Sequence, residues 1–362
     1  MTGSACGHGD LGRVALLCGA RRDGTNAILA YTRLLDRALR DQGVVSTVEI
    51  VEAASLPNLR PYDTVVLQYN PFLYGRWGFA PHLVASLGRA RLGATRPRLV
   101  LMVHETYFPI SDWRSAIMGS TQWGQLRALH AMSDVVFASI ESWTGLLSGW
   151  RPSRPVSHLP VGSNLPDRGG ERAAARAEIE ADDATIVVAS FGTGHPSRLT
   201  DHLVAAGDAV ARCQRRVLML NLGAGARPLD GLNREIRVIQ PGPLPTADLA
   251  RLLSAADLFL APFVDGVSTR RGSLMAAMQH ALPVLGTYGH LTDESLRTSG
   301  ALELVARDDI AAFAQAAAAL AQDPTRRAAL GAAAAALYRR DFDWPAIATR
   351  MRECIVCMDS SR

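Results

Sequence analysis

Short apolar runs alternate with longer amphipathic runs along most of the chain, and this alternation constrains the fold more than any other feature. Runs such as TIVVASF and DVVFASI are apolar on both faces, as strands buried between two layers of helices are. Strands of this kind that alternate with helices are typical of a parallel sheet covered on both sides. The alternation occurs in two series. The sequence therefore predicts an α/β protein with two doubly wound parallel-sheet domains.

The first series fills the N-terminal half of the chain. A helix is expected over residues 25–40, where Ile28, Leu35 and Leu39 recur near helical spacing. The strands are expected at RVALLCG, VSTVEIV, DTVVLQY, RLVLMVH, DVVFASI and VSHLPVG.

The second series follows the segment 167–183. Its strands are expected at TIVVASF, RVLMLNL, IRVIQPG, DLFLAPF and PVLGT, and its helices over 198–213, 246–256 and 272–281. The chain is expected to be helical again from about Thr325 onward, with a break at Trp344 and Pro345 before a final amphipathic helix.

Composition narrows the class of protein. The 362 residues are 48% hydrophobic and 20% charged, which is ordinary for a soluble enzyme of two domains. A formal net charge of +4 gives no indication of a nucleic-acid partner. No run is apolar enough for a signal peptide or a transmembrane span, and five cysteines give no disulfide framework, so a cytoplasmic location is expected. No residue is a lysine, so a phosphate site would rely on the guanidinium fork of arginine.

Two stretches in the first half follow predicted strands and carry residues suited to a ligand. In CGARRDGTNA, Gly24 gives a flexible backbone and Thr25 or Asn26 can cap the next helix, whose free N–H groups suit an anion. An ordinary strand-to-helix turn explains this stretch almost as well. In MVHETYFP, His104 lies at the carboxyl end of a predicted strand, where doubly wound sheets bind their ligands. A solvent-facing histidine is the alternative interpretation.

A third candidate stretch, SFGTGHPSRLTDHL, opens the second series. Gly192 and Gly194 allow close approach of a ligand to the backbone, and Arg198 stands at the expected start of a helix. A cation there opposes the helix dipole, and an anion bound between the two would remove the conflict. A neighbouring acid such as Asp201 would do the same.

The fourth stretch, FVDGVSTRRGS, combines an acid, paired cations and a Gly-Ser helix start. Asp265 can accept hydrogen bonds from sugar hydroxyls, and Arg270 and Arg271 can neutralise a diphosphate. The N–H groups of Gly272 and Ser273 can cradle the same anion at the helix N-terminus. A surface turn with solvated arginines is the alternative.

Candidate sites in both domains, with most cations in the second, fit a nucleoside-diphosphate sugar. The chain resembles the retaining glycosyltransferases of GT-B fold, in particular glycosyltransferase family four. SFGTGHPSRLTDHL resembles the glycine turn and basic residue of that family, and LPTADLARLLSAADLFLAPF resembles the helix and strand before its donor loop. LAQDPTRRAALGAAAAALYRRDFDWPAIA is similar to its closing segment. MVHETYFP, SDVVFASIESW and HLPVGSN resemble landmarks of its first domain more loosely.

The resemblance implies three regions of the chain. Residues 1–165 would form a Rossmann-like acceptor-binding domain, and residues 166–340 a Rossmann-like domain that binds the nucleotide-sugar donor. Residues 341–362 would form a helix that crosses back to the first domain.

The resemblance also implies roles for single residues. Asp265 in the acid-glycine pair and His104 would contact the transferred sugar, and Arg198 would contact the diphosphate. From the residue types themselves, Arg198, Arg270, Arg271 and the helix N-terminus are expected to stabilise the departing diphosphate in place of a metal ion. The expected activity is retaining transfer of a sugar to a hydroxyl of a natural product or glycan, with no cofactor besides the donor.

One departure from the family pattern leaves alternatives open. The family usually has a second glutamate that binds the ribose of the donor, and the matching position is Ala276 or Ser273, depending on the direction of counting. The loop that holds Arg270 and Arg271 is also longer than usual. A non-catalytic protein that binds nucleotide sugars with the same fold, or a sugar-nucleotide epimerase, fits the same residues. An oxidoreductase is disfavoured because the G-x-G-x-x-G fingerprint is absent.

An aromatic stretch in the first half, QYNPFLYGRWGFAPHL, allows three interpretations. Tyr69, Phe72, Tyr74, Trp77 and Phe79 can stack on an acceptor ring, contact a membrane surface peripherally, or pack against the core of their own domain. The sequence leaves these three open, as it does the oligomeric state and the acceptor.

Overall fold

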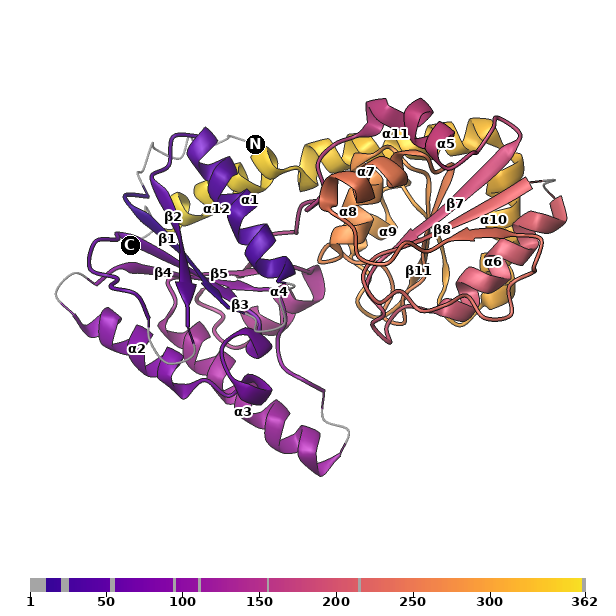
Figure 1. The fold of residues 1–362 in the computed structure, drawn as a ribbon. Helices are drawn as coiled ribbons and strands as arrows, with labels where there is room; N and C mark the ends of the chain where they lie inside the picture. Colours follow the sequence, from indigo (N-terminus) through magenta and orange to yellow (C-terminus); the bar gives the residue numbers. More distant parts are fainter. Residues whose placement is uncertain are drawn as a thin grey trace. The chain divides into compact units, whose positions relative to one another are not determined.

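A computed structural model describes residues 11–20, 26–52, 56–93, 96–109, 112–154, 156–213 and 216–359 (Figure 1). The chain divides into two compact units. The first unit comprises residues 1–160 and 344–362, and the second comprises residues 161–343. Each unit contains one parallel sheet of six strands, so the predicted fold class is confirmed.

The sheet of the first unit has the order β2-β1-β3-β4-β5-β6. Its strands are β1 (Val14–Gly19), β2 (Ser46–Val51), β3 (Thr64–Tyr69), β4 (Arg98–Val103), β5 (Val135–Ala138) and β6 (Val156–His158). Its helices are α1 (Ala27–Asp41), α2 (Pro81–Leu92), α3 (Trp113–Met132), α4 (Glu141–Ser148) and the single turns η1 (Pro71–Leu73) and η2 (Arg76–Gly78). Every residue of β1 and β3 is buried, as their continuous apolar runs predict.

The final helix, α12 (Trp344–Asp359), belongs to the first unit although it follows the second unit in the chain. It packs beside α1, and the two helices lie on the face of the sheet opposite α2 and α3 (Figure 1). The side-chain amide of Gln42 donates to the carbonyl of Pro345 at 2.9 Å and to the Thr349 hydroxyl at 3.0 Å. The ring of Tyr31 lies 5.1 Å from that of Trp344.

The sheet of the second unit has the order β12-β11-β10-β7-β8-β9. Its strands are β7 (Thr185–Phe191), β8 (Arg216–Leu222), β9 (Arg237–Ile239), β10 (Leu258–Ala261), β11 (Val284–Tyr288) and β12 (Glu303–Ala306). Its helices are α5 (Arg172–Glu178), α6 (Thr200–Cys213), α7 (Thr246–Ser254), α8 (Gly272–Gln279), α9 (Glu294–Arg297), α10 (Ile310–Gln322) and α11 (Pro324–Leu337), with the short turns η3 (Gly169–Glu171) and η4 (Tyr338–Phe342). One core cluster of this unit lies between the strands and the pair α6 and α10.

Three differences between the structure and the sequence-based elements have a clear physical reason. The edge strand β12 is not predicted, because its residues are all half-buried and form no continuous apolar run. Helix α6 starts at Thr200 instead of Arg198, because Arg198 forms an antiparallel bridge with Phe263. The break near Trp344 comes earlier, at the π-helical turn η4, and α12 begins at Trp344 itself. Among the described helices, none has the length and apolar character needed to cross a bilayer.

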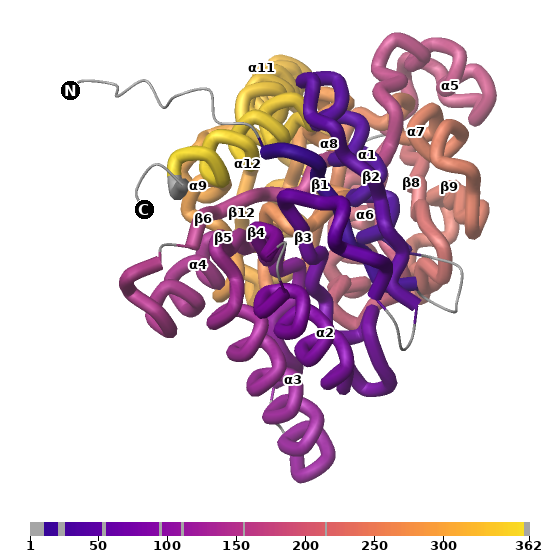
Figure 2. The backbone as a smooth tube through the Cα atoms, turned by 90° about the vertical axis from the view of Figure 1, so that its left-hand side faces the viewer, coloured from indigo at the N-terminus to yellow at the C-terminus, as the bar shows by residue number. Residues whose placement is uncertain are grey.

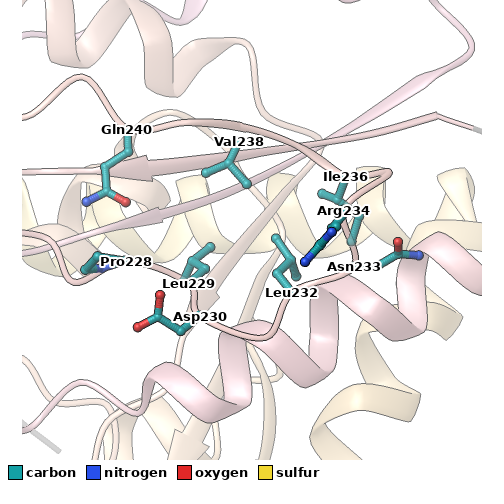
Figure 3. Close-up of a pocket in the computed structure, with 9 residues that line it drawn as sticks. All are labelled: Pro228, Leu229, Asp230, Leu232, Asn233, Arg234, Ile236, Val238 and Gln240. Atoms are coloured by element: carbon teal, nitrogen blue, oxygen red, sulfur yellow. The ribbon is translucent and has the colours of Figure 1, made fainter.

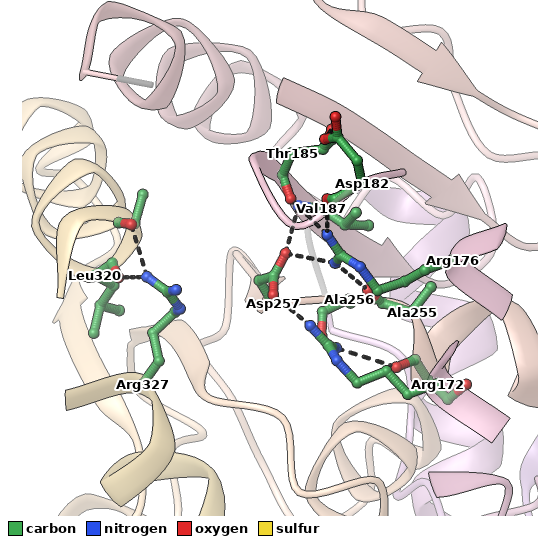
Figure 4. A network of polar contacts seen from close by, with 12 residues as sticks. Arg172, Arg176, Asp182, Thr185, Val187, Ala255, Ala256, Asp257, Leu320 and Arg327 are labelled. Carbon is green, nitrogen blue, oxygen red and sulfur yellow. Dashed lines mark hydrogen bonds and ion pairs between the residues drawn. The ribbon is translucent and has the colours of Figure 1, made fainter. Parts of the chain in front are cut away.

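A polar network around Asp257 ties three elements of the second unit together (Figure 4). One carboxylate oxygen accepts from the backbone N–H of Val187 at 2.8 Å and pairs with Arg176 at 3.0 Å. The other oxygen pairs with Arg172 at 2.5 Å. Asp257 immediately precedes β10, whereas Val187 is in β7 and both arginines are in α5. This one carboxylate therefore fixes α5 on the strands that carry the candidate site.

We expect Asp257→Asn to lower the free energy of unfolding of the second unit by about 2 kcal/mol, because charged hydrogen bonds to a mostly buried group are lost. Urea unfolding followed by circular dichroism measures this. The matched control is Asp248→Asn, which removes an exposed pair with Arg251 and should cost no more than about 0.5 kcal/mol. Equal losses in the two variants would refute the role given to Asp257.

Candidate functional site

Three segments of the second unit meet at the carboxyl ends of β7 and β10. They are the turn after β7 (residues 192–199), the loop before α8 (residues 262–271) and the first turn of α8. The first two run antiparallel: the N–H of Leu199 donates to the carbonyl of Pro262 at 3.0 Å, and the N–H of Val264 donates to that of Ser197 at 2.8 Å. Parallel α/β sheets bind their ligands at this edge.

The glycines of the turn after β7 allow two turns to pack backbone against backbone. A Cβ on Gly194 would lie 2.0 Å from the carbonyl oxygen of Gly225, and one on Gly223 would lie 2.2 Å from that of Gly192. Around Gly192 a Cβ would meet nothing within 4 Å. Gly194 is therefore needed for packing against the turn after β8, and the approach of a ligand to Gly192 and Gly194 stays a prediction.

Arg198 is a buried cation that has no carboxylate partner among the described residues. Its side chain is 7% exposed, and its Nη2 donates to Oδ1 of Asn221 at 2.8 Å. Among the described residues it forms no ion pair, and its Nε has no hydrogen-bond acceptor. Burial lowers the pKa of this guanidinium to about 10, so it stays charged at neutral pH. A buried charge that lacks a counterion is unfavourable, and a bound anion would relieve it.

Asn221 itself is held in a fixed orientation. Its Nδ2 donates to the carbonyl of Arg227 at 2.8 Å and to Oε1 of Gln240 at 2.9 Å, so its Oδ1 is left to face Arg198. Sequence reasoning missed Asn221. A polar residue near the end of the apolar run RVLMLNL is a signal that could have found it.

Arg270 and Arg271 lie around Asp265. Each guanidinium has an Nη2 atom 3.6 Å from Oδ2 of Asp265, and His290 approaches Oδ1 at 3.8 Å. Arg271 also donates to the hydroxyl of Ser197 at 3.2 Å and stacks over the ring of Phe263, 4.1 Å from its centroid. Arg271 is therefore connected to the Arg198 turn through Ser197 and Phe263.

The loop that carries these charges is fixed at both ends. Gly266 has φ of +85°, and a Cβ there would lie 2.1 Å from the hydroxyl oxygen of Thr292 and 2.3 Å from the nitrogen of Gly289. At the other end, the carboxylate of Asp293 accepts from the N–H of Thr269 at 2.6 Å and from its hydroxyl at 2.8 Å. Gly272 and Ser273 then open α8, whose first turn has no acid and no side-chain cap from Arg271.

The electrostatic potential in this region is positive. Burial lowers the pKa of His195, and the charges of Arg271 and Arg270 lower it further, with Asp265 opposing them. Arg270 and Arg271 pair with Asp265, and Arg198 adds a third guanidinium group that forms no ion pair among the described residues. The arrangement can hold an anion with several oxygens, such as a diphosphate.

The two positions at which the family places its ribose-binding acid hold no carboxylate here. Ala276 is fully buried within α8, and Ser273 is half-buried in its first turn. Gly24 and Thr25, the predicted anion turn of the first unit, lie outside the described residues.

His104 lies in the first unit, directly after β4, and its ring is 7% exposed. Its Nε2 lies 2.8 Å from Oε1 of Gln68, and its ring meets that of Tyr31 edge-on at 4.8 Å. Burial lowers the pKa of His104 to about 3, so the imidazole is neutral at physiological pH. Because Oε1 can only accept, Nε2 carries the proton in this arrangement. A solvent-facing position, the alternative reading of the sequence, is therefore wrong.

We expect the stability of the first unit to fall as the pH falls from about 6.5 toward 3, because the unfolded chain binds a proton that folded His104 does not. The slope from this group approaches about 1.4 kcal/mol per pH unit. His104→Asn should flatten the dependence of unfolding free energy on pH between pH 4 and 5.5 by about this amount. The matched control is the same substitution at exposed His290. Equal slopes in the two variants would contradict the placement of His104.

A separate pocket of about 340 Å³ lies in the second unit (Figure 3). It contains none of the predicted site residues. Its link with the site is Gln240, whose amide holds Asn221. The lining residues are Pro228, Leu229, Asp230, Leu232, Asn233, Arg234, Ile236, Val238 and Gln240.

Two parallel six-stranded sheets, each flanked by helices, match solved structures of the GT-B fold. The chain is similar to sucrose-phosphate synthase of Thermosynechococcus elongatus, with 16% identity, a TM-score of 0.70, and coverage of 97% of this chain and 100% of that one. It is similar to HepE of Anabaena in complex with UDP and glucose, with 16% identity, a TM-score of 0.67, and the same coverage. It is also similar to WaaG, a glycosyltransferase involved in lipopolysaccharide biosynthesis, with 13% identity, a TM-score of 0.62, and coverage of 95% of this chain and 99% of that one. At such identities the likeness establishes the fold.

A comparison with protein-family models gives more specific information about the second unit than the likeness in fold does. Residues 185–323, from the start of β7 to the end of α10, match the model of the family described as Glycosyl transferases group 1. This range contains Arg198, Asp265, Arg270 and Arg271, so the candidate site lies within a domain that matches this family. No curated protein matches the chain significantly in sequence.

Proposed function

We propose that the protein is a glycosyltransferase that uses a nucleoside-diphosphate sugar, binds its diphosphate at the site around Arg198, and acts in the cytoplasm without a metal ion. The family match of residues 185–323 supports the reaction class. HepE, which is similar in fold, has been solved in complex with UDP-glucose, and this supports a nucleoside-diphosphate sugar as the donor. The acceptor is a hydroxyl of a natural product or a glycan.

The observation that carries the proposal is the buried charge of Arg198, which has no ion-pair partner among the described residues and is joined through Ser197 and Phe263 to the arginine pair Arg270 and Arg271. A surface turn with solvated arginines would leave its cations exposed, whereas Arg270 and Arg271 keep side-chain exposures of only 16% and 17%. Arginine forks bind phosphate oxygens in pairs. Three such groups and the N-terminus of α8 match a pyrophosphate better than a single carboxylate or a neutral ligand.

In the proposed reaction, the bond between the anomeric carbon and the diphosphate oxygen breaks while the acceptor oxygen bonds to the same carbon. The arginines and α8 stabilise the charge that grows on the departing diphosphate. A phosphate oxygen of the leaving group takes the acceptor proton on the face it leaves, so the configuration is retained and no protein base is named. Asp265 accepts hydrogen bonds from sugar hydroxyls. The assignment of His104 to the same sugar stays a prediction.

A second function, binding of a nucleotide sugar without turnover, is favoured by Ala276 and Ser273. Neither side chain can take the place of a ribose-binding carboxylate. Recognition of the nucleoside then depends on other groups, or the chain has kept the fold and lost the activity.

One experiment separates these possibilities. The full chain is incubated with a panel of nucleoside-diphosphate sugars, with and without acceptors, and the free diphosphate and the sugar are followed by chromatography. A glycosyltransferase releases diphosphate, slowly by hydrolysis and faster with its acceptor. An epimerase changes the sugar with no acceptor present. Binding with no change in any donor indicates the non-catalytic protein and overturns the proposal.

A further inference from the structure

The turn after β7 holds a histidine, His195, close to the buried cation Arg198. The carbonyl of His195 accepts from the N–H of Arg198 at 3.1 Å, and this bond closes a β-turn over residues 195–198. Pro196 takes the second position of the turn, where its fixed φ is favourable. The Cα atoms at the two ends of a β-turn lie within about 7 Å of each other. The turn therefore brings His195 next to the cation on which the proposed diphosphate site depends.

Hydrogen bonds to one side of the ring fix the tautomer of His195. Its Nδ1 lies 3.1 Å from the backbone nitrogen of Ser197, whose N–H can only donate, so Nδ1 is the acceptor. The hydroxyl oxygen of Ser197 lies 2.9 Å from the same Nδ1. This hydroxyl accepts from Nη1 of Arg271 at 3.2 Å and donates its own proton to the ring. In the neutral imidazole the proton is therefore on Nε2.

The Nε2 atom of His195 is the side of the ring that a ligand can reach. His195 is exposed, and among the described residues no group forms a hydrogen bond with Nε2. Because Ser197 holds the opposite side of the ring, the Nε2–H donor has a set direction before a ligand arrives. A donor that is ordered in advance loses little conformational freedom on binding.

The backbone that leads into His195 is fixed by a neighbouring link. A Cβ on Gly194 would lie 2.0 Å from the carbonyl oxygen of Gly225. Gly225 belongs to the link between β8 and β9, which are neighbouring strands of the second sheet (Figure 2). The same link carries Arg227, whose positive charge acts on His195. Contact with this link therefore limits where the turn that carries His195 can lie.

The charges that act on His195 are mostly positive. Burial lowers the pKa of the ring, the charges of Arg271 and Arg270 lower it further, Asp265 raises it, and Arg227 lowers it again. Three cations against one carboxylate favour the neutral imidazole when no ligand is bound. A bound diphosphate would add negative charge beside the same ring and favour the imidazolium instead.

We propose that His195 is a further residue of the diphosphate site: its Nε2 donates to a phosphate oxygen of the donor, and the ring takes up a proton from solvent when the donor binds. This inference rests on the proposed function, because it takes the anion at Arg198 to be the diphosphate of a sugar nucleotide. A guanidinium fork and an imidazolium at the two ends of one turn then give charge-assisted hydrogen bonds to the same anion.

The proposal has a consequence for the pH dependence of binding. A group whose pKa is higher in the complex than in the free protein strengthens binding at low pH. The gain is lost as the pH rises through the pKa that His195 has in the complex. A histidine that only shapes the turn would bind no proton with the donor and would give no such dependence.

Isothermal titration calorimetry of the full chain tests this, with UDP-glucose, GDP-mannose, ADP-glucose and dTDP-glucose as probes. Sugar nucleotides are used because both of their phosphates are esterified, whereas a terminal phosphate titrates at about pH 6 and would mask the effect. For a donor that binds, we expect the affinity to be roughly fivefold higher at about pH 6 than at about pH 8.5. Titrations at neutral pH in buffers of different ionisation enthalpy count the protons, and net uptake is expected.

The variant His195→Gln should remove both effects. Glutamine keeps an N–H donor but carries no charge, so the affinity should vary little with pH and the donor should bind without proton uptake. The matched control is His82→Gln, at a half-buried position in α2 of the first unit, which should keep the wild-type dependence on pH. His290→Gln tests the other histidine near Asp265 and should also keep it.

The outcomes separate this inference from the proposed function. Donor binding without proton uptake, or a pH dependence that His195→Gln leaves unchanged, overturns the inference and leaves the proposed function intact. Loss of the pH dependence in His290→Gln would assign the proton to His290 and overturn the inference too. If no donor binds at either pH, the proposed function fails and the inference fails with it. Circular dichroism checks the fold of each variant, and the proton count on the wild-type chain can refute the inference even if a variant unfolds.

Discussion

Turnover of the donor by the Arg198→Ala variant is expected to fall by about a hundredfold or more, as it does when one preorganised donor to a developing anion is lost. Arg198 is the buried charge of the site, and the hydrogen bond that it donates to Asn221 at 2.8 Å orients its guanidinium group. Steady-state kinetics with the donor identified by the panel assay measure this. Arg271→Ala should have an effect of similar size, because Arg271 joins the loop to the Arg198 turn through Ser197.

Two further variants sharpen the result. Arg198→Lys keeps the positive charge but loses the forked guanidinium group. Its turnover should therefore lie between those of the wild type and Arg198→Ala. Arg234→Ala removes an exposed arginine of the same unit and should leave turnover unchanged. Near-normal turnover in both Arg198→Ala and Arg271→Ala would refute the assignment of these residues.

Gly266→Ala is expected to lower the free energy of unfolding by about 3 kcal/mol and the affinity for a nucleoside diphosphate by at least about tenfold. The methyl group would overlap Thr292 and the backbone of Gly289, and φ of +85° disfavours any side chain. The loop has to move to accept it, and Asp265 moves with it. Thermal unfolding and isothermal titration calorimetry measure the two effects.

Gly231 provides a matched control for this substitution. Its φ is also +85°, but a Cβ there meets nothing within 4 Å. Gly231→Ala therefore introduces the same backbone strain but no steric overlap. It should lower the free energy of unfolding by about 1 kcal/mol and leave the affinity for a nucleoside diphosphate unchanged. If the two alanine variants behave alike, the packing of Gly266 does not position the site.

The fold could be predicted because its strands are apolar on both faces. β1 and β3 are buried along their whole length, so their sequences carry the signal without help from neighbours. β12 lies at a sheet edge with half-buried residues, and a run as short as ELVA has no such signal. Its place becomes clear only when β11 is present beside it.

The site could be predicted only in part, because local patterns do not show which segments meet. Arg270, Arg271 and Asp265 are close in sequence, and their types alone indicate an anion site. The pairing of Arg198 with Phe263 joins segments that are far apart in the chain, and so does the hydrogen bond that Thr269 donates to Asp293. The orientation of the Arg198 side chain depends on its hydrogen bond to Asn221, and therefore on β8 lying next to β7.

The burial of His104 is likewise a property of the assembled unit. The sequence places His104 at the end of β4, but its environment comes from Gln68 in β3 and Tyr31 in α1. Neither neighbour is recognisable from the run MVHETYFP. The low pKa of His104 follows from this packing.

The central claim is that the second unit binds a nucleoside diphosphate through Arg198 and its neighbours. Thermal unfolding of the full chain with uridine, guanosine, adenosine and thymidine diphosphates tests it most directly, since a ligand stabilises the fold in proportion to its binding free energy. We expect at least one diphosphate to raise the melting temperature well above the effect of its nucleoside, and we expect Arg198→Ala to abolish the rise. An unchanged melting temperature with every diphosphate, or an equal rise in Arg198→Ala, would contradict it.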